Sequence, residues 1–76
     1  MLSHFERRDP ERNIARFYSL HIQPTLFGEW DLLRTWGRIG SAGRLLINHH
    51  PDAGAAERAA EKLIRRRLRH GYRQRA

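Results

Sequence analysis

Hydrophobic and polar positions alternate along residues 14–23. Tyr18, Leu20 and Ile22 are apolar, and more polar residues separate them. A period of two is the pattern of a half-buried strand, so the segment 14–23 is predicted to be a strand. The segment 30–38 is rich in aromatic and aliphatic residues and predicts a second strand, and the segment 44–49 is predicted to be a third.

The connections between these segments contain residues that favour turns. Residues 24–28 join the first two strands, and Gly40-Ser41-Ala42-Gly43 is predicted to be a hairpin turn because glycine adopts positive φ at little cost. The polar residues 1–12, with a break at Asp9-Pro10, are either a first strand or a loose arm.

From residue 53 the apolar period becomes helical. One stripe collects the apolar residues Ala56, Ala60, Leu63, Ile64 and Leu68. Asp52 is a favourable N-cap, and Gly71 suits the left-handed position that follows a helix. A helix is therefore predicted over residues 53–70.

These elements predict an α+β fold, in which an antiparallel β-sheet carries one α-helix packed on one face. With 76 residues, the chain is long enough for one domain, 1–76, with a core spanning about residues 13–73. A domain this small needs its large apolar side chains inside. We assign to packing Phe5, Phe17, Tyr18, Phe27 and Trp30.

The basic charge is concentrated near the C-terminus. The chain has fifteen Lys and Arg against eight Asp and Glu, and Lys62 is the one lysine. Residues 1–56 contain seven basic and six acidic residues, whereas residues 57–76 contain eight and two. A one-sided positive field attracts polyanions, and the planar arginine fork favours phosphate.

Several classes of function find no support in the sequence. Without cysteine there is no thiolate metal site, and the adjacent His49 and His50 point to opposite faces of a strand. No Ser-His-Asp arrangement or pair of carboxylates suggests catalysis, so we expect a non-enzymatic protein without a cofactor. The charged start lacks an export signal, and apolar runs are too short to span a membrane, so we expect a cytoplasmic monomer.

The segment Trp36-Gly37-Arg38-Ile39-Gly40-Ser41-Ala42-Gly43 resembles the signature of the WGR domain. That domain is found in poly(ADP-ribose) polymerases and in small bacterial proteins. The resemblance extends over residues 13–73, through Arg16-Phe17-Tyr18, Gln23, Leu26-Phe27-Gly28, Trp30, the arginine-rich helix and Gly71-Tyr72. His50 departs from the family pattern, which often has an aromatic residue there.

The resemblance implies an antiparallel sheet flanked by a helix and a role in binding DNA. In the DNA-dependent polymerases, the motif Trp packs against the terminal nucleotide and nearby basic residues hold phosphates. Trp36 inherits that role by motif match, and Arg38 does so less directly because the motif Arg also serves contacts between domains. Nothing in the chain resembles the transferase domain, so that activity does not carry over.

Strand alternation places Arg34, Trp36 and Arg38 on one face, which we predict to be the ligand face, with Leu33 and Thr35 turned toward the helix. An indole flanked by guanidinium groups can stack on a base while the arginines bind phosphate. The alternative is that Trp36 is a core residue and Arg38 bridges it to a carboxylate such as Asp31. The candidate nucleic-acid-binding residues are Arg34, Trp36, Gly37, Arg38, Arg44, Arg65, Arg66, Arg69 and Tyr72.

Two of these residues have a structural alternative. Gly37 is interpreted as allowing a close backbone approach beside Trp36, and Gly40 and Gly43 as turn residues. Tyr72 either packs against the sheet, which we favour, or offers its hydroxyl to a phosphate.

The predicted function is nucleic-acid binding with weak sequence specificity, and DNA is favoured over RNA. No helix presents base-reading Asn or Gln residues, and the arginine cluster suits phosphates. The alternative is a protein-interaction module that docks through the same face and places its basic helix on an acidic surface. Membrane association is disfavoured because the alanine-rich stripe is needed for the core.

Overall fold

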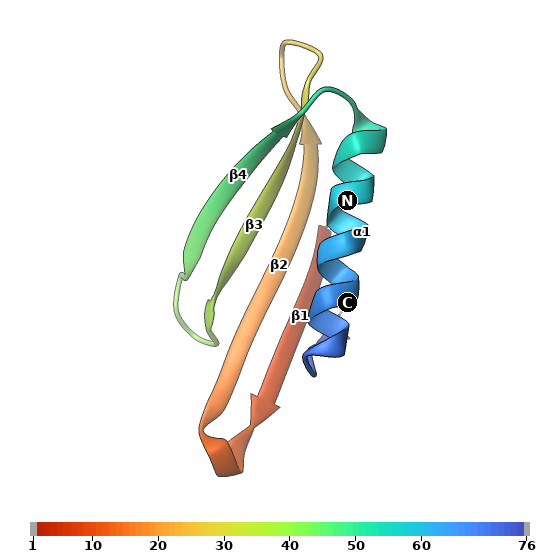
Figure 1. The fold of residues 1–76 in the computed structure, drawn as a ribbon. Coiled ribbons are helices and arrows are strands. Elements are labelled where there is room, and N and C mark those ends of the chain that lie inside the picture. The colour runs from red at the N-terminus through yellow and green to blue at the C-terminus, as the bar shows by residue number, and fades with distance from the viewer. Residues whose placement is uncertain (1, 76) are drawn as a thin grey trace.

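The alternating segments form one antiparallel sheet in the computed structural model, which describes residues 2–75 (Figure 1). One long helix packs on that sheet. In chain order the elements are β1 (Leu2–Asp9), the 3-10 turn η1 (Pro10–Arg12), β2 (Ile14–Pro24), β3 (Trp30–Arg38), β4 (Arg44–His50), α1 (Ala53–Arg69) and β5 (Arg73–Arg75). The predicted α+β class is confirmed.

The strand order is β4-β3-β2-β1-β5, and each neighbouring pair is antiparallel. Residues 2–9 are therefore an internal strand of the sheet, which decides between the two predictions for the N-terminal segment. Phe5 on this strand is fully buried, so the core begins before residue 13. The short strand β5 was not predicted.

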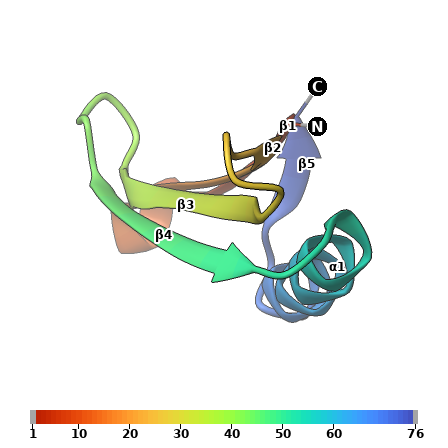
Figure 2. The ribbon, with the colours of Figure 1, turned by 90° about the horizontal axis from the view of Figure 1, so that it is seen from above.

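The helix covers the face of β2 that carries its predicted apolar side chains. Tyr18 and Leu20 are each 1% exposed, and the helix contributes Ala56 and Ala60, both at 0%. Alanines at these positions let the helix backbone approach the sheet closely. Figure 2 shows α1 on one side of the twisted sheet, while the β3–β4 turn projects away from the helix.

Both ends of the helix are formed by the predicted residues. The carboxylate of Asp52 accepts a hydrogen bond from the backbone N–H of Ala55, with 2.8 Å between nitrogen and oxygen. Gly71 has φ of 85°, and the next residue, Tyr72, donates its backbone N–H to the carbonyl of Arg67 at 3.1 Å. This turn brings the Tyr72 ring into the core, where it is 7% exposed.

Three core predictions are wrong. Phe17 lies on the face away from the helix, opposite Gly37, and stacks with the His4 ring outside the core cluster. Leu68 is 49% exposed, because Arg67 takes the position on the helix that faces the sheet and its guanidinium carbon lies 4.0 Å from the centre of the Tyr18 ring. Phe27 is 87% exposed, since it lies in the connection between β2 and β3, beyond the face that the helix covers. Leu63 and Ile64 are partly buried and pack against the core as predicted.

Candidate nucleic-acid interface

The strand register places Trp36 on the face of the sheet that the helix covers. Trp36 lies directly opposite Tyr18, a core residue, and directly opposed residues share a face. Leu33 and Thr35 therefore point to the other face. The sequence prediction was the reverse, with the helix on the Leu33 face, and it is wrong. Trp36 is half-buried and packs against the core.

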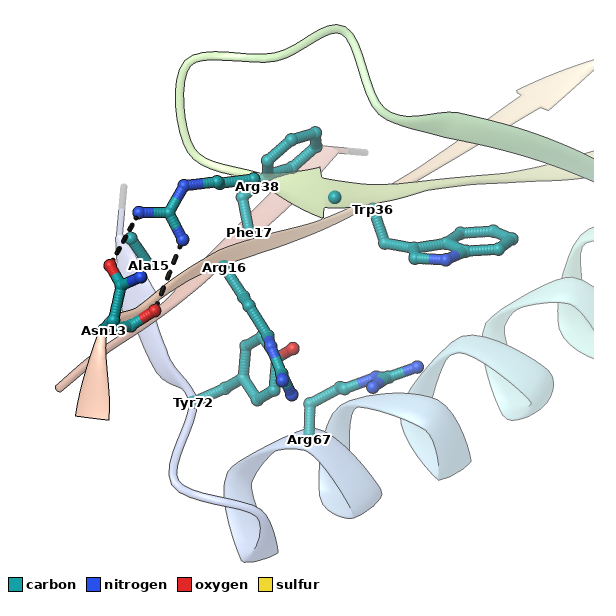
Figure 3. Close-up of a pocket in the computed structure, with 9 residues that line it drawn as sticks. Asn13, Ala15, Arg16, Phe17, Trp36, Arg38, Arg67 and Tyr72 are labelled. Carbon is teal, nitrogen blue, oxygen red and sulfur yellow. Dashed lines mark hydrogen bonds between the residues drawn. The ribbon is translucent and has the colours of Figure 1, made fainter.

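Trp36 also lines a cavity of about 450 Å³ between the sheet and the C-terminal end of the helix. We call this the Trp36 cavity; its walls include Arg16, Trp36, Arg38, Arg67 and Tyr72. Figure 3 shows the indole and Arg16 extending from the sheet toward the side where Arg67 and Tyr72 lie. No Asp or Glu is among the described residues that line this cavity. The indole is thus both a packing residue and part of a basic recess.

Aromatic rings hold Arg67 in the Trp36 cavity. Its guanidinium carbon is 4.0 Å from the centre of the Tyr18 ring and 5.5 Å from that of Tyr72. These are cation–π distances, so the rings restrict the charged group without neutralising it. The Nε of Arg67 and the hydroxyl of Tyr18 are buried, and neither has a hydrogen-bond partner in the described part of the chain. Of these two residues, Arg67 lines the recess, so its Nε is the unpaired donor nearest to a ligand there.

Arg38 is positioned by the turn between β1 and β2. Its guanidinium donates to the backbone carbonyl of Asn13 at 3.3 Å and to the side-chain oxygen of the same residue at 3.1 Å (Figure 3). Asn13 has φ of 55°, a left-handed conformation that asparagine tolerates. Asp31, the alternative partner, pairs with His49 at 2.5 Å, so a bridge from Arg38 to Asp31 is ruled out. Arg38 is held without losing its net charge to a carboxylate.

Glycines allow the hairpin turn to lie against the Trp36 strand. A Cβ atom on Gly37 would stand 2.8 Å from the Cα of Gly43, closer than real Cβ contacts. Gly43 has φ of 74°, and a Cβ atom there would collide with the carbonyl oxygen of Trp36 and lie 2.7 Å from the Phe17 ring. The predicted close approach at Gly37 and the turn at residues 40–43 are both present. The Trp-Gly-Arg tripeptide is therefore fixed by backbone packing.

A second cavity of about 500 Å³ lies between the β3–β4 hairpin and the helix. We call it the Arg34 cavity; its walls include Arg34, His50, Lys62, Arg66 and Arg69. Like the Trp36 cavity, it has no Asp or Glu among its lining residues within the described chain. Basic side chains of the sheet and of the helix thus face two recesses on the same side of the sheet.

The two cavities divide the predicted site residues. The Trp36 cavity contains Trp36, Gly37, Arg38 and Tyr72, and the Arg34 cavity contains Arg34, Arg66 and Arg69. Tyr72 is mainly a packing residue, as favoured. Arg44 lies opposite Trp36 on β4 and is exposed, and Arg65 is exposed on the helix; neither lines a cavity.

Sequence reasoning missed five basic residues that line the cavities, namely Arg16, His49, His50, Lys62 and Arg67. Alternation would have found Arg16, which stands two positions before Tyr18 on the same strand. Helical periodicity would have found Arg67, which stands four positions after Leu63. An arginine on an apolar stripe is readily passed over in favour of a neighbouring leucine.

Other kinds of site receive no support in residues 2–75. These residues contain no group of three His, Cys, Asp or Glu side chains that could hold a metal ion. No helix in this part of the chain has the length and apolar character to cross a membrane.

Comparisons with known proteins bear on the whole chain. Residues 1–76 match the WGR domain family. An uncharacterized protein of Sinorhizobium fredii, y4dW, is 46% identical over 70 residues, which are 92% of this chain and 34% of that protein. A crystal structure of a Bacteroides fragilis protein superposes with a TM-score of 0.85 at 28% identity, covering 100% of this chain and 20% of the other.

The chain spans about a third of the curated relative and a fifth of the solved one. WGR is a non-catalytic module. The match over all 76 residues, together with the Trp36-Gly37-Arg38 hairpin and the sheet-and-helix fold, shows that this chain belongs to the WGR domain family.

Proposed function

We propose that this protein binds nucleic acid, with DNA as the expected ligand, along the side of the sheet that bears the two cavities. One observation carries the proposal: within residues 2–75 the cavities gather seven arginine and lysine side chains and no carboxylate. Such a surface attracts polyanions, and its contacts fall mainly on phosphates, which carry no sequence information. Weak sequence specificity follows.

Trp36 gives the site a feature that a simple cation patch lacks. Its indole lines a basic recess beside Arg16 and Arg67, so a base or sugar can contact the ring while arginines bind the flanking phosphates. WGR domains generally bind nucleic acid, which supports the same interpretation. The rival ligand is a protein that docks on the same face and places an acidic surface against the basic helix. A purely acidic chain such as polyglutamate offers the indole no flat ring for stacking.

A salt titration tests the proposal. Lys62, Arg66 and Arg69 are exposed on the helix, so replacing all three with Gln should leave the fold intact. If each neutralises a phosphate, log K for a duplex should depend less steeply on log salt, and the magnitude of the slope should decrease by roughly 3. The matched control replaces Arg12, Arg58 and Arg73, which are exposed and line neither cavity.

Equal losses in the two triple variants would contradict binding at the cavities, because net charge alone would then explain the affinity. A parallel titration with polyglutamate distinguishes the rival ligand. Trp36→Leu should weaken DNA binding and leave polyglutamate binding unchanged, whereas tighter binding of polyglutamate than of DNA would favour the protein-interaction module. Blunt, nicked and single-stranded oligonucleotides then define the preferred end and strand state.

A further inference from the structure

The Arg34 cavity contains two buried polar atoms without partners. The Nε of Arg34 and the Nε2 of His50 are shielded from solvent, and neither has a hydrogen-bond partner among residues 2–75. Both residues line the same cavity. Buried polar atoms in folded proteins nearly always have partners, so two unpaired nitrogens in one recess point to a ligand that accepts hydrogen bonds. An arginine Nε always carries a hydrogen, and a histidine Nε2 carries one in the corresponding tautomer.

The surroundings of Arg34 offer its charge no compensation. Its directly opposite neighbours are Leu20 on β2 and Leu46 on β4, which are both apolar. The other charged groups on the cavity wall are Lys62, Arg66 and Arg69, which add to the positive potential. A partly buried guanidinium without a counter-ion is unfavourable, so this cavity is complementary to an anion.

We propose that the Arg34 cavity binds a phosphate group. Arg34 and His50 are the inner donors, and Lys62, Arg66 and Arg69 supply the outer charges. Phosphate suits this set because its several oxygens can accept from more than one arginine fork at once. The volume of about 500 Å³ exceeds that of a phosphate alone, so the cavity also accepts a phosphate carried by a larger molecule.

The phosphate has two sources with the same chemistry. It can belong to the backbone of the nucleic acid, in which case this inference rests on the proposed function, or to a small phosphorylated molecule that binds without any strand. The second source would make the Arg34 cavity a separate ligand site beside the Trp36 cavity. The experiment therefore starts with phosphate alone and adds the strand afterwards.

The test is a titration of the full chain with inorganic phosphate at constant ionic strength, followed by NMR of the His50 ring and the Arg34 Nε–H. We expect saturable shifts of both signals. Arg34→Gln should weaken binding about tenfold or more, since it removes charged hydrogen bonds. His50→Phe, which keeps a ring but removes both nitrogens, should weaken it as well, so the test does not depend on one variant. Arg58→Gln, an exposed helix residue away from the cavity, should bind like the parent chain.

Non-saturating shifts, or equal shifts at all arginines, would overturn the proposal and show only diffuse ion attraction. If phosphate saturates the site, an oligonucleotide that displaces it identifies the backbone as the source. An oligonucleotide that binds without displacing it identifies a small phosphorylated ligand. DNA binding without saturable phosphate binding rejects this inference alone, whereas saturable phosphate binding without DNA binding rejects the proposed function alone.

Discussion

The two faces of the sheet differ in how their charged side chains are paired. On the open face, away from the helix, the carboxylates of Glu6 and Asp31 lie beside basic groups within 4 Å. On the face that the helix covers, Arg34 and Arg67 have a buried Nε without a partner, and no carboxylate lines either cavity within the described chain. Arginines on the open face therefore contribute to ion pairs that stabilise the fold, whereas those on the covered face keep unpaired donors.

Glu6 has three basic neighbours on the open face. Its carboxylate lies 3.3 Å from His4, 3.2 Å from Arg8 and 3.7 Å from Arg75. The hydrogen bond from His4 lowers the pKa of Glu6, and Arg8 adds to that effect while partial burial opposes it. Net charge alone, at +7, would not reveal which arginines are available to a ligand. The pairing does.

The largest expected effect contrasts the apolar residues of the two faces. Leu32, on the covered face, is 1% exposed, whereas Leu45, on the open face, is 58% exposed. Leu32→Ala should lower the free energy of unfolding by about 2–5 kcal/mol, because it leaves a cavity in the core. Leu45→Ala should change it by at most about 1 kcal/mol. Denaturant titration of both variants checks this, and equal losses would mean that the open face is also a core.

The next effect concerns the turn behind the Trp36 strand. Gly43→Ala meets both a positive φ and a collision with the carbonyl of Trp36, so it should cost roughly 3 kcal/mol or more. Gly40→Ala has a positive φ of 95° and no atom within 4 Å, so it should cost about 1–2 kcal/mol. Thermal unfolding measures both. A Gly43 variant no less stable than the Gly40 variant would show that the turn does not fix the tripeptide.

Variants of Trp36 and Trp30 distinguish a loss of packing from a loss of binding. Both pack against the core, but Trp36 alone of the two lines the basic Trp36 cavity. Trp36→Leu and Trp30→Leu should each reduce stability, and Trp36→Leu should also weaken DNA binding by about 1–3 kcal/mol through lost stacking. Binding is measured by fluorescence anisotropy at a temperature where both variants are folded. Equal binding losses in the two variants would remove the special role of Trp36.

The smallest effect is a pH dependence on the open face. The folded pKa of Glu6 lies below its ordinary value of 4.5, so its charged form stabilises the fold above that value. The stabilisation is lost as the pH falls through the folded pKa. Thermal unfolding from pH 6 to pH 2 should therefore show Glu6→Gln less stable than the parent chain at pH 6, with the difference vanishing at low pH. A difference in stability that stays constant over this pH range would mean that Glu6 acts through packing and not through its charge.

The sequence predicted the elements well because their local signals agree. Strand alternation at Tyr18, Leu20 and Ile22, the cap at Asp52 and the stop at Gly71 each depend on nearby residues only. Strand β5 could not be predicted, since three polar residues, Arg73–Arg75, form a strand only because β1 offers them an edge.

The face of Trp36 was mistaken for a reason that lies in tertiary packing. Both faces of β3 carry apolar residues, so alternation could not say which one the helix covers. The helix covers the face with Trp30, Leu32 and Trp36, because burying these side chains is more favourable than burying Leu33 and Thr35. Arg34 lies on the same face and is therefore covered as well. The rule that arginines avoid a covered face failed at the cavities, where we propose that the unpaired arginines bind a ligand.

The most direct test of this account is which face of the sheet a DNA oligonucleotide contacts. In an NMR titration, we predict the largest changes at the indole N–H of Trp36 and at the Nε–H groups of Arg34 and Arg67. The methyl groups of Leu45 and Ile47 on the open face should change little. Large shifts of those methyl groups, with the Trp36 and arginine signals unmoved, would contradict the account and place the interface on the face where the charges are already paired.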